Sequence, residues 1–233
     1  MVGLHKSNNK MDKLTEVQIA FLNKHTVGTW KLNNGLVDIR GSFNCTDNDI
    51  VDFKVIQFGE VTVDFYCYNN AITSLKGAPQ KVGGDFKCYH NELTSLDGAP
   101  QKVVGNFDCS HNNLTSLKGA PLEVGWNFEC EHNRLTSIVG APQEVGGHFD
   151  CNNNKLTSLE GAPQKVADGF YCVENRLISL EGGPLEVGDK FWCDGKLFGS
   201  DVEIEIKEFL TQIIPEDVDC LSYAKAFTKQ LNR

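Results

Sequence analysis

Phenylalanine and cysteine recur together along the chain at a fixed interval of 21 residues. Each repeat has a phenylalanine, a cysteine two residues later, two leucine-type residues and a valine, separated by mostly polar residues. The phenylalanines that mark the regular spacing are Phe65, Phe86, Phe107, Phe128, Phe149, Phe170 and Phe191. A constant period of this length predicts a solenoid, in which units too small to fold alone stack on their neighbours.

The repeat that starts at Phe86 shows what each coil is expected to contain. Polar residues alternate with Phe86 and Cys88, which predicts a short strand with these two side chains pointing inward. Leu93, Leu96 and Val103 then return the chain across the core. The glycine–alanine–proline segment between them turns the chain on the outer side and disfavours a helix, because proline fixes φ and lacks an N–H donor. We therefore expect a parallel β-sheet on one face and an extended, non-helical back.

The first and last repeats depart from the pattern. The first starts at Phe43 and needs 22 residues to reach Phe65. The last starts at Phe191 but has Lys196 and Phe198 in the asparagine and leucine positions. Because terminal repeats of solenoids are usually atypical, the sequence predicts a domain of eight coils over residues 43–198.

The segment before the repeats has the signals of a helix and a hairpin. Thr15-Glu-Val-Gln18 is a capping box, which predicts a helix from about Glu16 to His25, ended by Gly28. Asn34-Gly35 is a strong turn signal between two strand-like runs. We interpret residues 1–42 as an N-terminal cap that covers the first coil.

The segment after the repeats has helical periodicity. Ser200-Asp-Val-Glu203 is a second capping box, and Pro215 separates two amphipathic stretches. Residues 199–233 are therefore expected to form two helices that close the far end of the core. A separate pair of partner-binding helices is the alternative.

Cysteine and asparagine each recur at one repeat position. Neighbouring parallel strands lie about 4.8 Å apart with their side chains pointing the same way, so the cysteines are poorly placed to form disulfides. We interpret them as reduced, buried, apolar side chains. A buried asparagine ladder would satisfy loop backbone groups between coils; its members are Asn48, Asn70, Asn91, Asn112, Asn133, Asn154 and Asn175.

Composition and motifs exclude several classes of function. The formal net charge of −9 lacks the basic footprint of a nucleic-acid-binding protein. The sequence has neither a secretory signal nor an apolar run of about 20 residues, which predicts a cytoplasmic protein without membrane contact. It also lacks a Walker loop, a GxGxxG after a strand, a nucleophile elbow and an HExxH. We therefore expect neither catalysis nor a cofactor.

The pattern Phe-x-Cys-x-x-Asn-x-Leu-x-x-Leu resembles the LxLxxNxLxxL core of leucine-rich repeats. The Leu-Thr-Ser-Leu and proline signature is most similar to the short repeats of secreted bacterial effectors. This resemblance covers about residues 43–198 and implies a leucine-rich-repeat solenoid that binds partners on its strand face. The whole chain also resembles repeat proteins encoded by tailed bacteriophages, which implies a location in the host cytoplasm.

The outward positions beside the cysteines differ from repeat to repeat. Aromatic residues lie toward both ends of the expected sheet, with an acidic block between them. Adjacent like charges in a sheet are destabilising by up to about 1 kcal/mol per pair, and a cationic partner would relieve them. We interpret this surface as a binding face for a basic protein segment, and an ordinary solvated sheet face is the alternative. Its residues are Tyr66, Tyr68, Lys87, Tyr89, Asp108, Glu129, Glu131, Asp150, Tyr171 and Trp192.

Histidines form a further ladder at His90, His111 and His132. Three imidazoles about 5 Å apart could bind zinc or nickel. Such ladders also arise when repeats duplicate, so a metal site is the less favoured interpretation.

The sequence thus predicts a non-catalytic interaction protein that binds a protein partner on its strand face. The phage resemblance implies inhibition of a host protein. Two alternatives remain: a protein that sequesters a small ligand such as a nucleotide through its tyrosines and histidines, and a structural component of a virion.

Overall fold

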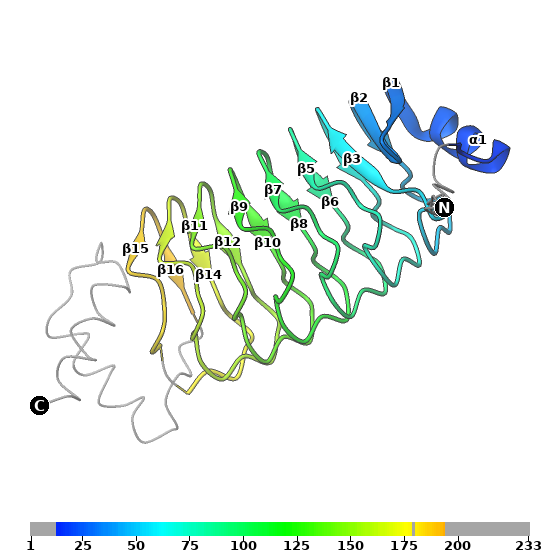
Figure 1. Ribbon diagram of the computed structural model, residues 1–233. Helices are drawn as coiled ribbons and strands as arrows, with labels where there is room; N and C mark the ends of the chain where they lie inside the picture. Colours follow the sequence, from blue (N-terminus) through cyan, green and yellow to red (C-terminus); the bar gives the residue numbers. More distant parts are fainter. Residues whose placement is uncertain (1–12, 179, 194–233) are drawn as a thin grey trace, which may run out of the picture.

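The computed structural model describes residues 13–178 and 180–193, which form a parallel β-solenoid of about seven turns, each about 21 residues long. Figure 1 shows the coils stacked along one axis, with helix α1 (Glu16–His25) at the N-terminal end. The strands form one sheet with two arms, and these arms meet at β2 (Leu36–Asn44). Strand β1 (Thr26–Asn33) pairs with β2 alone.

Each arm of the sheet is a column with one short strand per coil. The phenylalanine column consists of β4 (Phe65–Tyr66), β6 (Phe86–Lys87), β8 (Phe107–Asp108), β10 (Phe128–Glu129), β12 (Phe149–Asp150), β14 (Phe170–Tyr171) and β16 (Phe191–Trp192). The valine column consists of β3 (Phe58–Val61), β5 (Lys81–Val82), β7 (Lys102–Val103), β9 (Glu123–Val124), β11 (Glu144–Val145), β13 (Lys165–Val166) and β15 (Glu186–Val187). The sequence predicted the first column and treated the second as part of the extended back.

The predicted inward residues form a continuous core. The rings of Phe65 and Phe86 stack with centroids 5.3 Å apart and planes 6° apart, and Phe86 repeats this contact with Phe107 at 5.5 Å. All three side chains are fully buried. Such aromatic pairs contribute about 0.5–1.5 kcal/mol beyond the burial of their area. The phenylalanine position therefore stabilises each coil against the next.

The cysteines lie beside this stack as buried thiols, in agreement with the prediction. Burial raises the pKa of the Cys45 thiol to about 12. The Cys130 thiol donates a hydrogen bond to the Asp150 carbonyl of the next coil at 3.1 Å. The buried free thiols are Cys45, Cys67, Cys88, Cys109, Cys130 and Cys151.

The asparagine ladder is confirmed with one exception. Asn112 shows the pattern: its Nδ2 donates to the carbonyls of Cys88 and Cys109 at 3.0 and 3.2 Å, and its Oδ1 accepts from the Leu93 N–H at 2.9 Å. Asn48, in the irregular first coil, is exposed and accepts from Lys24 Nζ at 2.9 Å instead. The remaining members repeat the bonds of Asn112; they are Asn70, Asn91, Asn133, Asn154 and Asn175.

The N-terminal helix starts at the predicted signal but does not end at the predicted residue. Its start is as predicted, because Thr15 and Gln18 form a capping box. The prediction that Gly28 ends the helix is wrong: Thr26 already has an extended backbone, with φ −90° and ψ 125°. Gly28 instead lies within β1, where it pairs with Gly41 of β2.

The predicted hairpin is confirmed, and it is longer than expected. Asn34 and Gly35 both have positive φ, at 50° and 79°, as the two central residues of a type I′ turn require. Strand β2 continues to Asn44, so it crosses the expected boundary between residues 42 and 43. The hairpin is therefore continuous with the first coil.

The glycine–alanine–proline segment turns the chain as predicted, and it also contributes side chains to the core. Gly98 has a φ of 96°, and a Cβ there would lie 2.7 Å from the Leu75 carbonyl oxygen. This is why a glycine recurs at the turn. The next two residues point inward, since Ala99 is 2 % exposed and Pro100 is also buried. Each coil thus has more inward positions than the sequence indicated.

Some predictions lie outside the described residues. These are the substitutions at Lys196 and Phe198 and the two C-terminal helices at 199–233. Across residues 13–178 and 180–193, the structure contains no helix with the length and hydropathy needed to cross a membrane.

Candidate functional site

The register of the phenylalanine column brings the predicted binding residues together. Each strand pairs in parallel with the next, so the outward residue of one coil lies directly beside that of its neighbour. In this order they are Tyr66, Lys87, Asp108, Glu129, Asp150, Tyr171 and Trp192. Tyr68, Tyr89 and Glu131 follow two positions further along their coils. We call the outward side that carries these ten residues the front face.

The N-terminal part of the front face is aromatic. The Tyr68 and Tyr89 rings stack with centroids 4.3 Å apart and planes 8° apart. Tyr66 lies 6.1 Å from Tyr68, and Lys87 Nζ lies 6.0 Å from the centre of the Tyr66 ring. Burial raises the pKa of both Tyr66 and Tyr89 to about 12. The phenols are therefore neutral and present ring edges and hydroxyls to a partner.

The central acidic part of the front face is partly buried. Asp108 is only 9 % exposed, and its Oδ1 accepts hydrogen bonds from the Ser110 N–H and hydroxyl at 3.0 and 2.7 Å. Burial raises the pKa of Asp108 to about 6, although the bonds from Ser110 oppose this shift. The alternative of an ordinary solvated sheet face does not describe Asp108, because this carboxyl is buried.

Glu131 is the least satisfied group of the front face. Its Oε2 is buried without a hydrogen-bond partner in the described part of the chain. Burial, together with the nearby carboxylates of Asp150 and Asp108, raises the pKa of Glu131 to about 7. Burial also raises the pKa of Asp150. The centre of the front face therefore takes up protons near neutral pH.

His148 belongs to this cluster and was missed by the sequence reasoning. Its Nε2 lies 3.3 Å from Glu129 Oε1, and this hydrogen bond raises the pKa of His148. Its ring lies 5.8 Å from Tyr171 at the C-terminal end of the front face. One signal could have identified it. His148 takes the repeat position that holds aspartate or asparagine in the four preceding coils, at Asp64, Asp85, Asn106 and Asn127.

The C-terminal end of the front face is aromatic, as predicted. Trp192 is 59 % exposed, and Tyr171 lies beside it in the register of β14 and β16. Together with the tyrosines at the other end, these side chains flank the acidic centre.

The histidine ladder has a structural explanation. His90, His111 and His132 have φ values of 49°, 51° and 53°, in the left-handed region that histidine tolerates better than most residues. Their rings stack with centroids 4.2 and 4.3 Å apart and planes 17° and 15° apart. Nitrogen lone pairs lie in the ring planes, so nearly parallel rings do not converge on one ion. Among the described residues, no three His, Cys, Asp or Glu side chains are placed to hold a metal ion.

No protein-family model, curated protein or solved structure matches the chain. The resemblances to leucine-rich repeats and to proteins of tailed bacteriophages remain predictions that rest on the residue pattern. The fold itself is a parallel β-solenoid with turns of about 21 residues.

Proposed function

We propose that the protein is a non-catalytic interaction module that binds a basic segment of a partner protein on its front face. The observation that carries this proposal is the acidic centre. There, Asp108, Glu129 and Asp150 follow one another in register, and Glu131 Oε2 is buried without a partner among the described residues.

Electrostatics supports a cationic partner. Like charges in adjacent strands repel each other, and burial increases the free energy of keeping them ionised. A lysine or arginine side chain placed among these carboxylates would supply hydrogen bonds and positive charge together. Binding would then lower the pKa values of Asp108 and Glu131 and release protons.

The flanking aromatic side chains add contact area of the kind found at binding hot spots. Trp192 is largely exposed at one end, and Tyr66 and Tyr89 lie at the other. In this proposal the coils are of the leucine-rich-repeat type, and α1 with its hairpin caps the first coil. If the phage resemblance holds, the partner is a host protein that the module inhibits in the host cytoplasm.

The nucleotide-binding alternative has less support. Stacked neighbours cover both ring faces of His111 and one ring face of Tyr89, which reduces the ring surface on which a base could stack. The acidic centre also repels phosphate groups. A virion role is separable by the experiment that follows, because a purely structural component would not bind short basic peptides.

Binding to immobilised peptides tests the proposal. We expect lysine- and arginine-rich 12-residue peptides to be retained at pH 7.5, and glutamate-rich peptides of equal length to be washed off. The double variant Asp150→Asn, Glu131→Gln should lose at least about tenfold in affinity, because it removes two of the central carboxylates. Glu92→Gln, an exposed carboxylate in the coil that starts at Phe86, is the control and should bind as the unchanged protein does. Equal retention of basic and acidic peptides, or unchanged binding by the double variant, would disprove the acidic-face proposal.

A further inference from the structure

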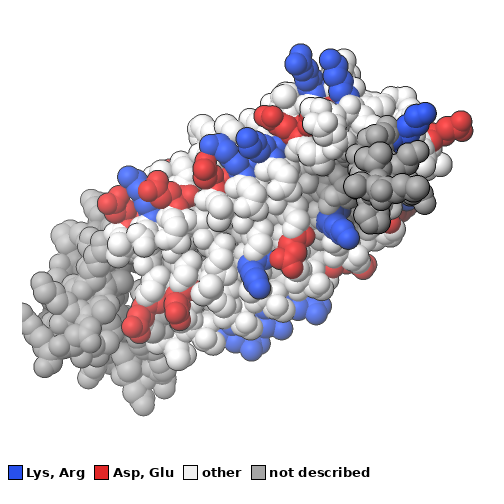
Figure 2. All heavy atoms as spheres, in the orientation of Figure 1, with Lys and Arg blue, Asp and Glu red and all other residues white. Residues whose placement is uncertain are grey.

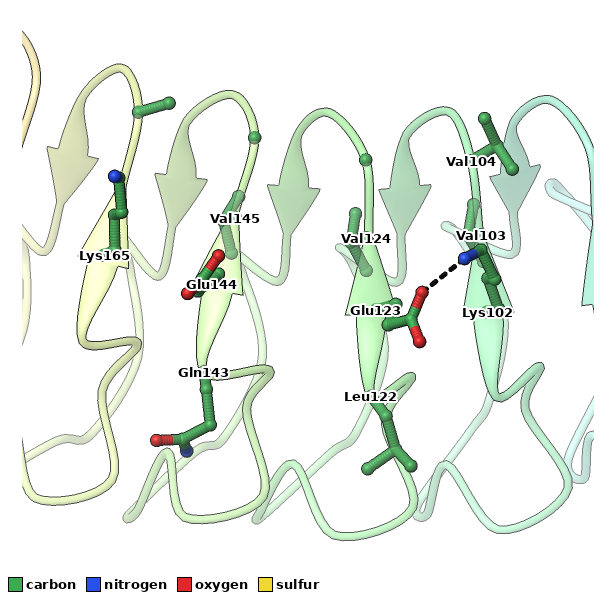
Figure 3. Close-up of a pocket in the computed structure, with 13 residues that line it drawn as sticks. Lys102, Val103, Val104, Leu122, Glu123, Val124, Gln143, Glu144, Val145 and Lys165 are labelled. Carbon is green, nitrogen blue, oxygen red and sulfur yellow. Dashed lines mark hydrogen bonds and ion pairs between the residues drawn. The ribbon is translucent and has the colours of Figure 1, made fainter.

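The outward side of the valine column is a second surface that the proposed function does not use. It contains a groove of about 580 Å³ over β7, β9, β11 and β13 (Figure 3). Gly125 and Gly146 line the groove, and Val104 and Leu122 border it with exposed fractions of 50 % and 70 %. Exposed aliphatic side chains beside bare backbone are typical of a surface that another protein covers.

A row of charged residues runs along this surface, one residue per coil. The residues, all exposed, are Glu60, Lys81, Lys102, Glu123, Glu144, Lys165 and Glu186. Figure 2 shows acidic and basic side chains along the upper edge of the molecule. We call it the charged row.

The sign of the charge does not alternate strictly from coil to coil along the charged row. Lys81 and Lys102 are register neighbours of like charge. Ion pairs within the described residues join Lys102 to Glu123 and Lys165 to Glu186. Ion pairs within one chain therefore join only some of the charges of the charged row.

We propose that a second copy of this chain covers this surface, in an antiparallel dimer. Two equal faces can meet around a two-fold axis that runs parallel to the strands. Such an axis reverses the order of the coils but places each repeat position opposite the same position of the partner. The charged row of one copy then faces the charged row of the other in reverse order.

One register makes every facing pair opposite in charge. With the axis between the coils of Lys102 and Glu123, Lys102 faces the partner's Glu123. In the next coil, Lys81 faces the partner's Glu144, and beyond it Glu60 faces the partner's Lys165. At the centre, each Lys102 contacts an acid of its own chain and one of the partner. The two copies thus form a closed network of alternating charges.

Neighbouring registers place like charges together. Moving the axis onto the coil of Glu123 brings this residue opposite the partner's Glu123 and sets Lys81 opposite the partner's Lys165. Moving it onto the coil of Lys102 sets that residue opposite the partner's Lys102. Like-charge contacts across an interface oppose binding, so the sequence of charges selects a single register.

Side-chain size fits the same register. Two positions after the charged row, Val104 faces the partner's Gly125, and Gly83 faces the partner's Gly146. Val104 thus lies opposite bare backbone, and the two glycines allow the chains to approach closely. One position before the row, Gln101 faces the partner's Leu122. Val104 would also face a glycine, the partner's Gly146, with the axis on the coil of Glu123. Side-chain size is therefore compatible with the proposed register, and the charges select it.

The paired stretch includes six coils, from Glu60 to Lys165, and extends over about 24 Å at the usual strand spacing. Glu186 lies outside it, opposite the hairpin of the partner. There Asp38 and Lys31 are register neighbours of opposite charge. A contact of this length predicts a dimer of moderate affinity that weakens with salt, since exposed charges are screened beyond about 10 Å at 0.1 M ionic strength.

Sedimentation of charge-reversed variants tests the dimer. The unchanged protein should be dimeric at about 100 µM in 50 mM salt, a concentration at which interfaces of modest area associate. Lys102→Glu and Glu123→Lys should each raise the dimer Kd at least about tenfold, because each variant places two like-charge pairs at the axis. Mixing the two variants in equal amounts should restore the dimer, because each acid of one variant then faces a lysine of the other.

Restoration on mixing excludes misfolding as the cause of the loss in the separate variants. Lys118→Glu is the control, since it reverses an exposed charge outside the charged row and should leave the Kd unchanged. A monomeric unchanged protein at 100 µM overturns the proposal. Dimers that persist in both single variants, or a mixture that stays monomeric, overturn it as well.

Discussion

At the scale of single residues, the buried carboxyls of the front face make stability depend on pH. The folded protein raises the pKa of Glu131 to about 7, above its ordinary value of 4.5, chiefly through burial. An acid with a raised pKa binds its proton more tightly in the folded than in the unfolded state. The folded state is therefore destabilised as pH rises from about 4.5 to about 7.

Glu131→Gln removes this dependence, because a neutral amide of similar shape has no charge to desolvate. We expect the variant to be more stable than the unchanged protein by about 1–3 kcal/mol at pH 8, allowing for partial solvent screening, and nearly equal to it at pH 4.5. Urea unfolding at both pH values measures the difference. Glu92→Gln, exposed on the surface, should show no such dependence on pH. A Glu131→Gln variant that is less stable at pH 8 would contradict the burial argument.

Sequence reasoning succeeded for residues whose role is repeated in every coil. Asn112 was recognised as a ladder residue because the same amide bonds are needed wherever one coil meets the next. Sequence reasoning failed where the role of a residue depends on the surroundings of one particular coil. The burial of Asp108 and the contact between His148 and Glu129 depend on which side chains neighbouring coils happen to carry, and the period contains no information about this.

At the scale of elements, the N-terminal hairpin shows a glycine whose role depends on tertiary contact. Gly28 and Gly41 face each other where β1 crosses β2. A Cβ on Gly28, whose φ is 124°, would lie 2.2 Å from the Arg40 carbonyl oxygen. In the sequence alone, a glycine at this place is equally consistent with ending the helix and with close pairing between two strands. Only the pairing partner, 13 residues later, distinguishes the two roles.

Gly28→Ala should therefore disrupt the pairing of β1 with β2 rather than lengthen α1. We expect a loss of at least about 2 kcal/mol in the free energy of unfolding, because the new methyl group meets backbone that cannot move aside. Hydrogen exchange should accelerate at the amides of the hairpin. Thr29→Ala, exposed in the same strand, is the control and should change stability by less than about 0.5 kcal/mol. Increased helix content on circular dichroism would instead favour the helix-ending role.

At the scale of the whole molecule, the stack of coils is a one-dimensional structure in which each coil contacts mainly its neighbours. The sequence predicted this architecture from the period alone. It did not predict the second column, because a lysine or glutamate before a valine is too short a pattern to indicate a strand. Because of the valine column, each coil forms strand pairs with its neighbours at two places. The outward side of this column is the surface on which the dimer is proposed. Both surfaces thus follow from one repeat, and they differ only in the residues that the repeat leaves variable.

The buried thiols allow the opening of the stack to be followed coil by coil. Leu22 of α1 is fully buried in the core at the N-terminal end, and Phe21 lies 5.7 Å from Phe43 of the first coil. Leu22→Ala should cost about 2–5 kcal/mol, and because an end coil has only one neighbouring coil, this loss should fray the first coil before the middle ones. Alkylation in mild urea, followed by peptide mapping, should then modify Cys45 well before Cys130. Ile19→Ala, on the exposed side of the same helix, should leave the order and rate of labelling nearly unchanged. Simultaneous labelling of Cys45 and Cys130 in the Leu22 variant would show that the coils open as one unit and that α1 does not protect the first coil in particular.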